Sequence, residues 1–290
     1  MRLLVAGAHG QLGSELVRLG DQHIVLAVDY QDLDITDAEA VKSTVSEFKP
    51  DAIINAAAYT AVDRAESERD QAFAVNCDGA KHLALAAELA SIPLIHVSTD
   101  YVYAGSKSAA YVEADAVGPL AVYGASKLAG EEAVQRHCSR SIILRTSWVF
   151  SAHGNNFVKT MLRLAQERET LGIVADQHGC PTSAAELARA IYAVLDAHVN
   201  EKNWGVYHFC QPEATTWFAF ASAIFKEARI QGVALKVSDV KAIATSDYPT
   251  PAKRPVNSVM NCVKFAQTFD FTIRPWSESL KEVIEELQNV

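Results

Sequence analysis

The sequence predicts an α/β fold, a doubly wound parallel sheet with a second, smaller lobe, and three observations support this class. Apolar, β-branched runs recur through the first half of the 290-residue chain. Stretches with helical spacing separate them, and such alternation predicts a parallel sheet covered on both faces. After about residue 150 the alternation breaks down. We therefore expect a main domain over 1–150, with return segments near 184–210, and the smaller lobe mainly over 151–290.

The five apolar runs are the expected strands of the main sheet: RLLVA at 2–6, IVLAV at 24–28, AIINA at 52–56, LIHVS at 94–98 and SIILR at 141–145. After the second strand, DAEAVKSTVSEF has helical spacing, and Thr36 with Glu39 could open this helix as a capping box. In sheets of this kind ligands bind at the carboxyl ends of the strands.

The second half is expected to contain four helices, one strand and a proline-rich loop. The helices are predicted over 155–168, 184–198, 216–229 and 277–289, the strand over 206–209, and the loop YPTPAKRP over 248–255. We expect the strand to return to the main sheet, so that the boundary between the two parts is not a single cut.

Composition and charge narrow the class of protein. With 49% hydrophobic and 21% charged residues the chain can bury a substantial core. A net charge of −9 argues against nucleic-acid or anionic-membrane binding, because no basic surplus exists to neutralise phosphates. No apolar run approaches the roughly 20 residues of a bilayer span, and MRLLVAGAHGQLG reaches its glycines too soon for a signal peptide. The five cysteines are scattered and lack a CxxC pair, as is typical of reduced thiols, so we expect a cytoplasmic protein.

A glycine-rich turn follows the first strand in LLVAGAHGQLGSEL, with Gly7, Gly10 and Gly13 in GxxGxxG spacing. Glycines let backbone approach a pyrophosphate, whose charge is stabilised by free N–H groups at a helix start. Gly10, Gln11 and Leu12 would lie closest to it. The alternative is a tight turn with close helix packing, but the position in a first βαβ unit favours a Rossmann-like dinucleotide site.

Residues after the next two strands could complete that site. Asp29 lies where an acid normally binds the adenosine ribose, which favours NADH over NADPH, although it could equally form a turn. Asp34 and Ile35 could hold the adenine, or Asp34 could belong to the following helix start. The small side chains of NAAAYT, 55–60, would let a cofactor lie flat on the backbone, or could simply pack well.

The segment PLAVYGASKLAGE places Tyr123 and Lys127 four positions apart on a predicted helix, so both side chains share one face. An adjacent cation favours the ionised phenol by roughly 1–3 pKa units, which would make Tyr123 a useful acid near neutral pH. In STDYVYAG, after the fourth strand, Ser98 or Thr99 would share the cleft. The alternative for the pair alone is an exposed helix surface; the glycine turn and the strand-end hydroxyl favour catalysis.

At this point the chain resembles the extended short-chain dehydrogenase/reductases and, within them, the dTDP-4-dehydrorhamnose reductase family. The motifs that carry the resemblance cover nearly the whole chain: GAHGQLG, NAAAYTAVDRAE, VSTDYVYAG, PLAVYGASKLAGE, LRTSWVF, GNNFVKTMLRLA, DQHGCPT and YPTPAKRPVNS. Several are long enough to indicate the family and not merely the fold.

The resemblance implies roles for individual positions. Those matching cofactor contacts are Gly10, Gln11, Leu12, Asp29, Asp34, Ile35, Ala58, Tyr59 and Thr60. The implied catalytic set is Thr99, Tyr123 and Lys127, the last two also touching the cofactor. The implied substrate contacts are Thr99, Asp100 and Trp148. Taken alone, Trp148 would more often be a core residue and Asp100 a turn residue. Arg254 could meet the substrate diphosphate or be a structural arginine in its loop.

The implied reaction is hydride delivery from NADPH or NADH to C4 of dTDP-4-dehydro-β-L-rhamnose, with Tyr123 protonating the carbonyl oxygen. The family tolerates both cofactors, so Asp29 does not exclude NADPH. A homodimer is a possible assembly. Some members hold Mg²⁺ at a dimer contact through an acid after PT, but PTSAAE shifts Glu186 by one place. No HExxH or Cys/His cluster is present, so we expect no metal.

A nucleotide-sugar epimerase and a regulatory subunit are the two alternative functions, whereas a dehydratase is disfavoured. Related dehydratases read Thr-Asp-Glu after the fourth strand, whereas this chain reads Thr-Asp-Tyr at 99–101, which favours simple reduction over elimination. A nucleotide-sugar epimerase is a weaker alternative. A non-catalytic, cofactor-binding regulatory subunit, like that of methionine adenosyltransferase, would not need Thr99, Tyr123 and Lys127.

Overall fold

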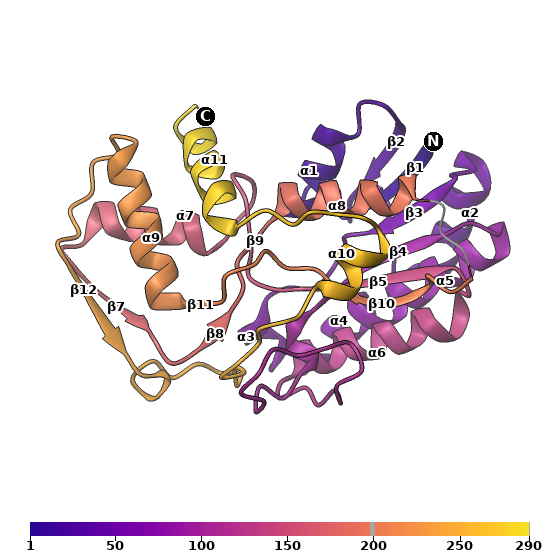
Figure 1. Cartoon of the computed structure of the whole chain (residues 1–290). Helices are drawn as coiled ribbons and strands as arrows, with labels where there is room; N and C mark the ends of the chain where they lie inside the picture. The colour runs from indigo at the N-terminus through magenta and orange to yellow at the C-terminus, as the bar shows by residue number, and fades with distance from the viewer. Residues whose placement is uncertain (198–200, 290) are drawn as a thin grey trace.

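Six parallel strands form the central sheet (Figure 1). The structure, a computed structural model, describes residues 1–197 and 201–289. In spatial order the strands are β10 (Gly205–His208), β5 (Ser141–Thr146), β4 (Leu94–Thr99), β3 (Ala52–Asn55), β1 (Arg2–Ala6) and β2 (Ile24–Val28). All neighbouring pairs are parallel. The predicted doubly wound sheet is therefore confirmed, and the strand expected near 206 does return to it beside β5.

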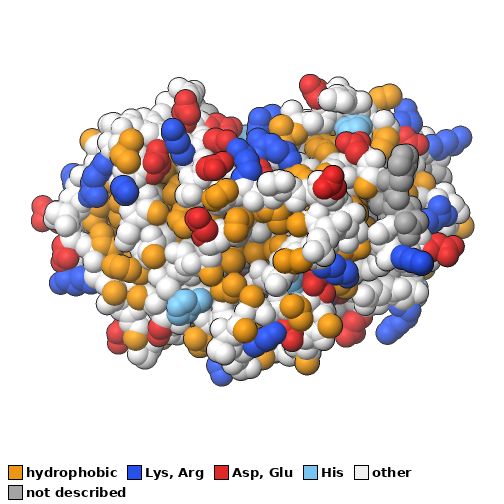
Figure 2. All heavy atoms as spheres, viewed as in Figure 1, with side chains coloured by type: hydrophobic (Ala, Val, Ile, Leu, Met, Phe, Trp, Pro, Cys, Tyr) orange, Lys and Arg blue, Asp and Glu red, His pale blue; other side chains and the backbone are white. Residues whose placement is uncertain are grey.

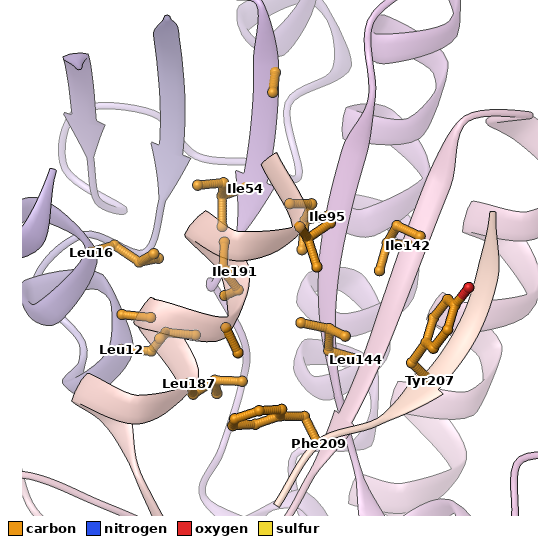
Figure 3. Close-up of a cluster of buried hydrophobic side chains, with 14 of the residues drawn as sticks. Leu12, Leu16, Ile54, Ile95, Ile142, Leu144, Leu187, Ile191, Tyr207 and Phe209 are labelled. Atoms are coloured by element: carbon orange, nitrogen blue, oxygen red, sulfur yellow. The ribbon is translucent and has the colours of Figure 1, made fainter. Parts of the chain in front are cut away.

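Helices cover both faces of this sheet, because successive strand residues point to opposite sides. Leu3 and Val5 face one core, and Leu4 faces the other; all three are fully buried. The first face is covered by α1 (Gln11–Leu19), α8 (Ala184–Asp196) and α10 (Val263–Thr268), and the second by α2 (Ala38–Phe48), α5 (Ala80–Ala90) and α6 (Val122–His137). Figure 3 shows the first core, in which leucines of α1 and α8 meet isoleucines of the strands. Because both faces of each strand are buried, residues that point to either side are apolar, which explains the continuous apolar runs.

A third core lies at the end of the molecule away from the sheet (Figure 1). It is built mainly by α7 (Phe157–Glu167), α9 (Trp217–Ile230), α11 (Trp276–Gln288) and the parallel pair β7 (Thr170–Val174) and β12 (Asp239–Ile243). Three predicted helices agree with α7, α9 and α11; the fourth corresponds to α8, its predicted residue 198 lying outside the described residues. The division at residue 150 stays a prediction, while α8 and β10 pack with the main sheet.

Several short elements complete the chain. They are β6 (Val149–Phe150), β8 (His178–Gly179), β9 (Thr182–Ser183), β11 (Thr215–Thr216), α3 (Val62–Ala65), α4 (Arg69–Phe73), the π-helical segment Ala74–Gly79 and the 3₁₀ turns Asp100–Val102 and Thr245–Asp247. The β7–β12 pair and these two-residue strands were not expected from the sequence. Strands this short carry too little periodicity to be recognised before their partners are known.

The expected capping box at α2 is wrong. Asp37, not Thr36, caps the helix, because its Oδ1 accepts from the N–H groups of Glu39 and Ala40, each at 3.0 Å. The Thr36 hydroxyl instead donates to Asp34 Oδ1 at 2.7 Å. The helix therefore begins one residue later than the capping box required, with a carboxylate as its cap.

Charged side chains of both signs are interspersed over the face shown in Figure 2. Within the described residues, no helix combines the length and the apolar character that crossing a bilayer requires.

Candidate active site

A cavity of about 830 Å³ lies at the carboxyl ends of the parallel strands. Strand order reverses at β1, which has β2 on one side and β3 on the other, and such a reversal opens a crevice where ligands bind. The predicted site residues that line this cavity are Gly7, Gly10, Gln11, Leu12, Asp29, Asp34, Ile35, Ala58, Tyr59, Thr60, Thr99, Asp100, Tyr123, Lys127, Trp148 and Arg254. Gly13 is not among the lining residues. One cavity thus brings together both halves of the predicted site.

Two of the three glycines of the turn serve close packing. Gly7 has a φ of +81°, and a Cβ there would lie 2.6 Å from the Ala57 nitrogen. A Cβ on Gly13 would lie 2.0 Å from the Gly7 carbonyl oxygen. Both distances are far below van der Waals contact, so any side chain would push the turn away from β3. The packing interpretation therefore holds for these two positions.

The third glycine leaves the start of α1 open to the cavity. The nearest atom to a Cβ on Gly10 would be the Gly7 oxygen at 3.3 Å, and Gly10 provides no side-chain cap. The Ser14 N–H donates to the Gly10 carbonyl at 2.9 Å. The N–H groups of Gln11 and Leu12 precede that bond and have no place in the helical ladder. A cradle of this kind fits the pyrophosphate of a dinucleotide.

The two acids after β2 are held by local hydrogen bonds. Asp29 Oδ2 accepts from the His9 N–H at 2.9 Å, and its Oδ1 accepts from the Tyr30 N–H at 2.7 Å. Asp34 Oδ1 accepts from the Thr36 N–H at 2.9 Å. Asp29 forms a local turn, as its alternative interpretation expected, whereas Asp34 bonds Thr36 just before the start of α2; both also line the cavity. Their contacts with ribose and adenine stay predictions.

Asn76, which the sequence analysis missed, fixes the cavity wall after β3. Its Oδ1 accepts from the Tyr59 N–H at 2.8 Å, and its Nδ2 donates to the Tyr59 carbonyl at 3.1 Å and to Ser126 Oγ at 2.9 Å. The residue lies in the π-helical segment, a distortion that often occurs at functional sites. It thereby ties this wall of the cavity to α6, which carries Tyr123. The only signal of Asn76 in the sequence is a polar residue that follows the apolar run AFAV.

Thr99 and Tyr123 meet in the centre of the cavity. The Thr99 oxygen caps the Asp100–Val102 turn by accepting from the Tyr101 N–H at 3.2 Å, and its hydroxyl donates to Asp100 Oδ1 at 3.0 Å. The Tyr123 hydroxyl lies beside the Thr99 side chain, and both residues line the cavity. The end of β4 and the start of α6 therefore place two hydroxyls side by side, as the sequence predicted.

The predicted lowering of the Tyr123 pKa by Lys127 is wrong for this structure. Burial raises the pKa of Tyr123, and the Asp100 charge adds to this, against an opposing contribution from the Thr99 hydrogen bond. Lys127 Nζ instead donates to the Val97 carbonyl at 2.7 Å, and burial lowers the pKa of Lys127 to about 8 against the charge of Glu131. Tyr123 thus keeps its proton near neutral pH, which suits a proton donor.

Asp100 is buried beneath this pair. Its Oδ2 has no hydrogen-bond partner among the residues that the structure describes. Burial raises the pKa of Asp100 to about 6, although hydrogen bonds, including the one from Thr99, oppose the shift. In the unfolded chain the pKa is near 3.9. The folded state therefore binds this proton more tightly than the unfolded chain. The stability that the protonated Asp100 contributes is complete below about pH 4 and is lost as the pH rises through about 6.

Asp100→Asn should remove this pH dependence. Relative to the wild type, the variant should gain about 3 kcal/mol of unfolding free energy between pH 4 and pH 7, since about two pKa units are involved. Urea unfolding across this range measures the gain. Asp21→Asn, at an exposed carboxylate, is the control and should run parallel to the wild type. Parallel profiles for both variants would contradict the shifted pKa of Asp100.

Two stacked tryptophans form part of the cavity wall. The rings of Trp148 and Trp217 lie 3.5 Å apart at 7°, and both residues line the cavity. Trp217 Nε1 donates to Gln177 Oε1 at 3.2 Å. Gly179 packs against Trp148, where a Cβ would lie 2.4 Å from the indole. Trp217 was not predicted as a site residue. Its indole lies in the first turn of the helix expected over 216–229, and this was a usable signal.

Arg254 reaches the cavity from the proline-rich loop. Its Nη2 donates to Asp63 Oδ2 at 2.9 Å, and its side chain is 27% exposed. Its Nε is buried and has no partner within the described part of the chain. The contact with Asp63 fits the structural alternative, while the unpartnered N–H at the cavity keeps the diphosphate interpretation open.

The acid implied as a metal ligand does not fit that role. Glu186 Oε2 accepts from Arg189 Nη1 at 2.9 Å and from Arg274 Nη2 at 3.0 Å, so two guanidinium groups neutralise it. One other group among the described residues could hold a cation: Glu15, His153 and Glu286. There Arg18 Nη2 already lies 2.5 Å from the Glu15 carboxylate. We assign no metal to the site.

Comparisons with known proteins agree with this geometry. The family model described as RmlD substrate binding domain matches residues 1–289. The dTDP-4-dehydrorhamnose reductase of Aggregatibacter actinomycetemcomitans is 47% identical, over 97% of this chain and 98% of that protein. The reductase structure from Clostridium acetobutylicum has a TM-score of 0.92 at 40% identity and covers 99% of this chain and 100% of that chain. The Bacillus anthracis reductase, in complex with NADP, has a TM-score of 0.92 at 37% identity, covering 98% and 99%. On these matches, the chain belongs to the RmlD substrate binding domain family.

Proposed function

We propose that this chain reduces the C4 keto group of dTDP-4-dehydro-β-L-rhamnose to give dTDP-L-rhamnose, using NADPH or NADH. One observation carries the proposal: the open start of α1 and the Thr99–Tyr123–Lys127 group line a single cavity. Relatives named dTDP-4-dehydrorhamnose reductase along nearly the whole chain support the reaction, and they give no support to the epimerase or the regulatory subunit.

Different residues of the cavity are proposed to bind the cofactor and to donate the proton. The N–H groups at the start of α1 hold the pyrophosphate, and Lys127 holds the nicotinamide ribose. When bound, the nicotinamide supplies hydride to C4. Thr99 and Tyr123 donate hydrogen bonds to the ketone oxygen, and Tyr123 transfers its proton as negative charge develops there. A raised pKa of Tyr123 is compatible with this step, because an alkoxide is a stronger base than a phenolate.

The substrate side is proposed to hold the nucleotide sugar. Trp148 and Trp217 form an apolar stack that lines the cavity. Arg254 supplies the local cation that a diphosphate needs in a protein with a net charge of −9. Its unpartnered Nε is the group that supports this assignment. Asp100 holds the Thr99 hydroxyl in place.

Arg254→Ala should raise the KM for the nucleotide sugar about 10–100-fold, because charge-assisted hydrogen bonds contribute about 1.5–3 kcal/mol. The affinity for NADPH should stay unchanged. Steady-state kinetics with a separate cofactor titration measure both quantities. Lys253→Ala, at the exposed neighbouring position, is the control and should behave as wild type. An unchanged KM in Arg254→Ala would leave Arg254 a purely structural residue.

The reaction itself is tested by incubating the purified protein with the keto sugar and NADPH or NADH. Loss of nicotinamide absorbance together with formation of dTDP-L-rhamnose is expected. An epimerase would convert the sugar without net cofactor oxidation. A regulatory subunit would bind the cofactor tightly without turnover. Testing several 4-keto nucleotide sugars in the same assay identifies the preferred base.

A cytoplasmic location and a homodimer are also part of this proposal. Five unpaired thiols support the first, and the family resemblance supports the second. Analytical ultracentrifugation tests the dimer.

A further inference from the structure

Three cysteines from distant parts of the sequence meet in one buried cluster with Tyr103 and Met260. Cys180 lies between β8 and β9, Cys210 follows β10, and Cys262 precedes α10. The Sγ atoms of Cys210 and Cys262 are 3.5 Å apart. The Cys210 N–H also donates to Cys262 Sγ, at 3.2 Å. Cys180 also lies close enough to the Cys210 thiol for the two groups to affect each other's pKa.

The three thiols differ in accessibility. Cys210 and Cys180 are each only 3% exposed, whereas Cys262 is half-buried and can be reached from solvent. The other two described cysteines, Cys77 and Cys138, lie on the opposite side of the main sheet, around α5 and α6. An oxidant of low molecular weight would therefore meet Cys262 first, with Cys210 directly behind it.

We propose that Cys210 and Cys262 form a site of reversible oxidation, in which a small disulfide such as oxidised glutathione converts the two thiols into an intramolecular disulfide. The Cys262 thiolate attacks the glutathione disulfide, forming a mixed disulfide and releasing one reduced glutathione. The Cys210 thiol then loses its proton and attacks Cys262 Sγ, releasing the second. The two protein thiols lose two electrons and two protons, and oxidised glutathione is reduced to two thiols.

The geometry favours this closure. A separation of 3.5 Å must shrink to about 2.05 Å for a disulfide, a movement that a half-buried side chain at a helix start can make. Hydrogen bonds with Cys180 and Cys262, together with burial, raise the pKa of Cys210. The second attack should therefore accelerate with rising pH. The bond would link the end of β10 to the start of α10 and close the loop that contains Trp217 and Arg254.

The test treats the folded, full-length protein with oxidised glutathione, blocks remaining thiols with iodoacetamide, and maps tryptic peptides by mass spectrometry. The expected product joins the Cys210 and Cys262 peptides, is lighter by two hydrogens, and reverts with dithiothreitol. Cys138→Ser is the matched control and should give the same product. Cys210→Ser should stop at a glutathione adduct on Cys262.

Three results would overturn the proposal. They are a Cys180–Cys210 link in place of the expected one, complete alkylation of Cys210 and Cys262 after oxidation, and a Cys210→Ser variant that takes no adduct. Circular dichroism compares Cys210→Ser with wild type, so that a folding defect is distinguished from a missing adduct. None of these readouts depends on the proposed reductase activity.

Discussion

Replacing Tyr123 with Phe should lower kcat by about 10²–10⁴-fold, the usual contribution of positioned proton transfer. The hydroxyl that meets the Thr99 side chain is the one group at the cavity centre proposed to protonate the ketone. Phenylalanine preserves the ring and its packing against Tyr101, whose centroid lies 5.5 Å away. The affinity for NADPH should therefore change little. Stopped-flow absorbance gives kcat, and fluorescence titration gives the Kd.

Tyr101→Phe is the matched control for this variant. Tyr101 also lines the cavity, and burial raises the pKa of its hydroxyl to about 12. Its side chain lies beside Arg254, whose positive charge opposes that shift. We expect this control to retain most of kcat and to affect mainly the KM for the nucleotide sugar. Equal losses of kcat in the two variants, or retained turnover in Tyr123→Phe, would contradict the acid assignment.

Elements whose signal is local could be predicted from the sequence. The run at 2–6 was recognisable because Leu3, Leu4, Val5 and Ala6 each face one of two apolar layers, and the structure places the strand at Arg2–Ala6. Tyr123 and Thr99 could be assigned to one cleft, because strand carboxyl ends and helix starts share one edge of such a sheet. The family resemblance then indicated one reaction, reduction of a keto sugar nucleotide, which residue spacing alone could not identify.

Features that depend on distant partners could not be predicted in this way. Asn76 matters because Tyr59 and Ser126 lie beside it in the fold, and nothing near it in the sequence indicates either. The pKa of Tyr123 was misjudged for a similar reason. The four-residue spacing indicated Lys127 as a neighbour that would lower the pKa of Tyr123. Burial has the larger effect on this pKa, and the Lys127 ammonium group donates to the Val97 carbonyl.

Arg145→Met should lower the free energy of unfolding by about 3–5 kcal/mol, since it leaves a buried carboxylate without its cation. Arg145 Nη2 lies 2.6 Å from Glu131 Oε2, with side-chain exposures of 6% and 2%. The Ser98 hydroxyl also donates to Glu131 Oε1 at 2.5 Å, and Arg145 Nη1 donates to the Tyr103 hydroxyl at 2.7 Å. This network joins β4, β5 and α6 beneath the cavity. Urea unfolding measures the loss.

Arg163→Met separates the effect of burial from that of losing any ion pair. Arg163 pairs with Glu167 at 3.1 Å, but both side chains are more than half exposed, so the loss should be about 0.5 kcal/mol or less. The double variant Glu131→Leu, Arg145→Met should recover much of the stability, because apolar replacement of a whole buried pair is often close to neutral. If Arg145→Met lost no more than Arg163→Met, the pair would not stabilise the fold. If the double variant recovered nothing, the hydrogen bonds to Ser98 and Tyr103, and not the unpaired charge, would account for the loss.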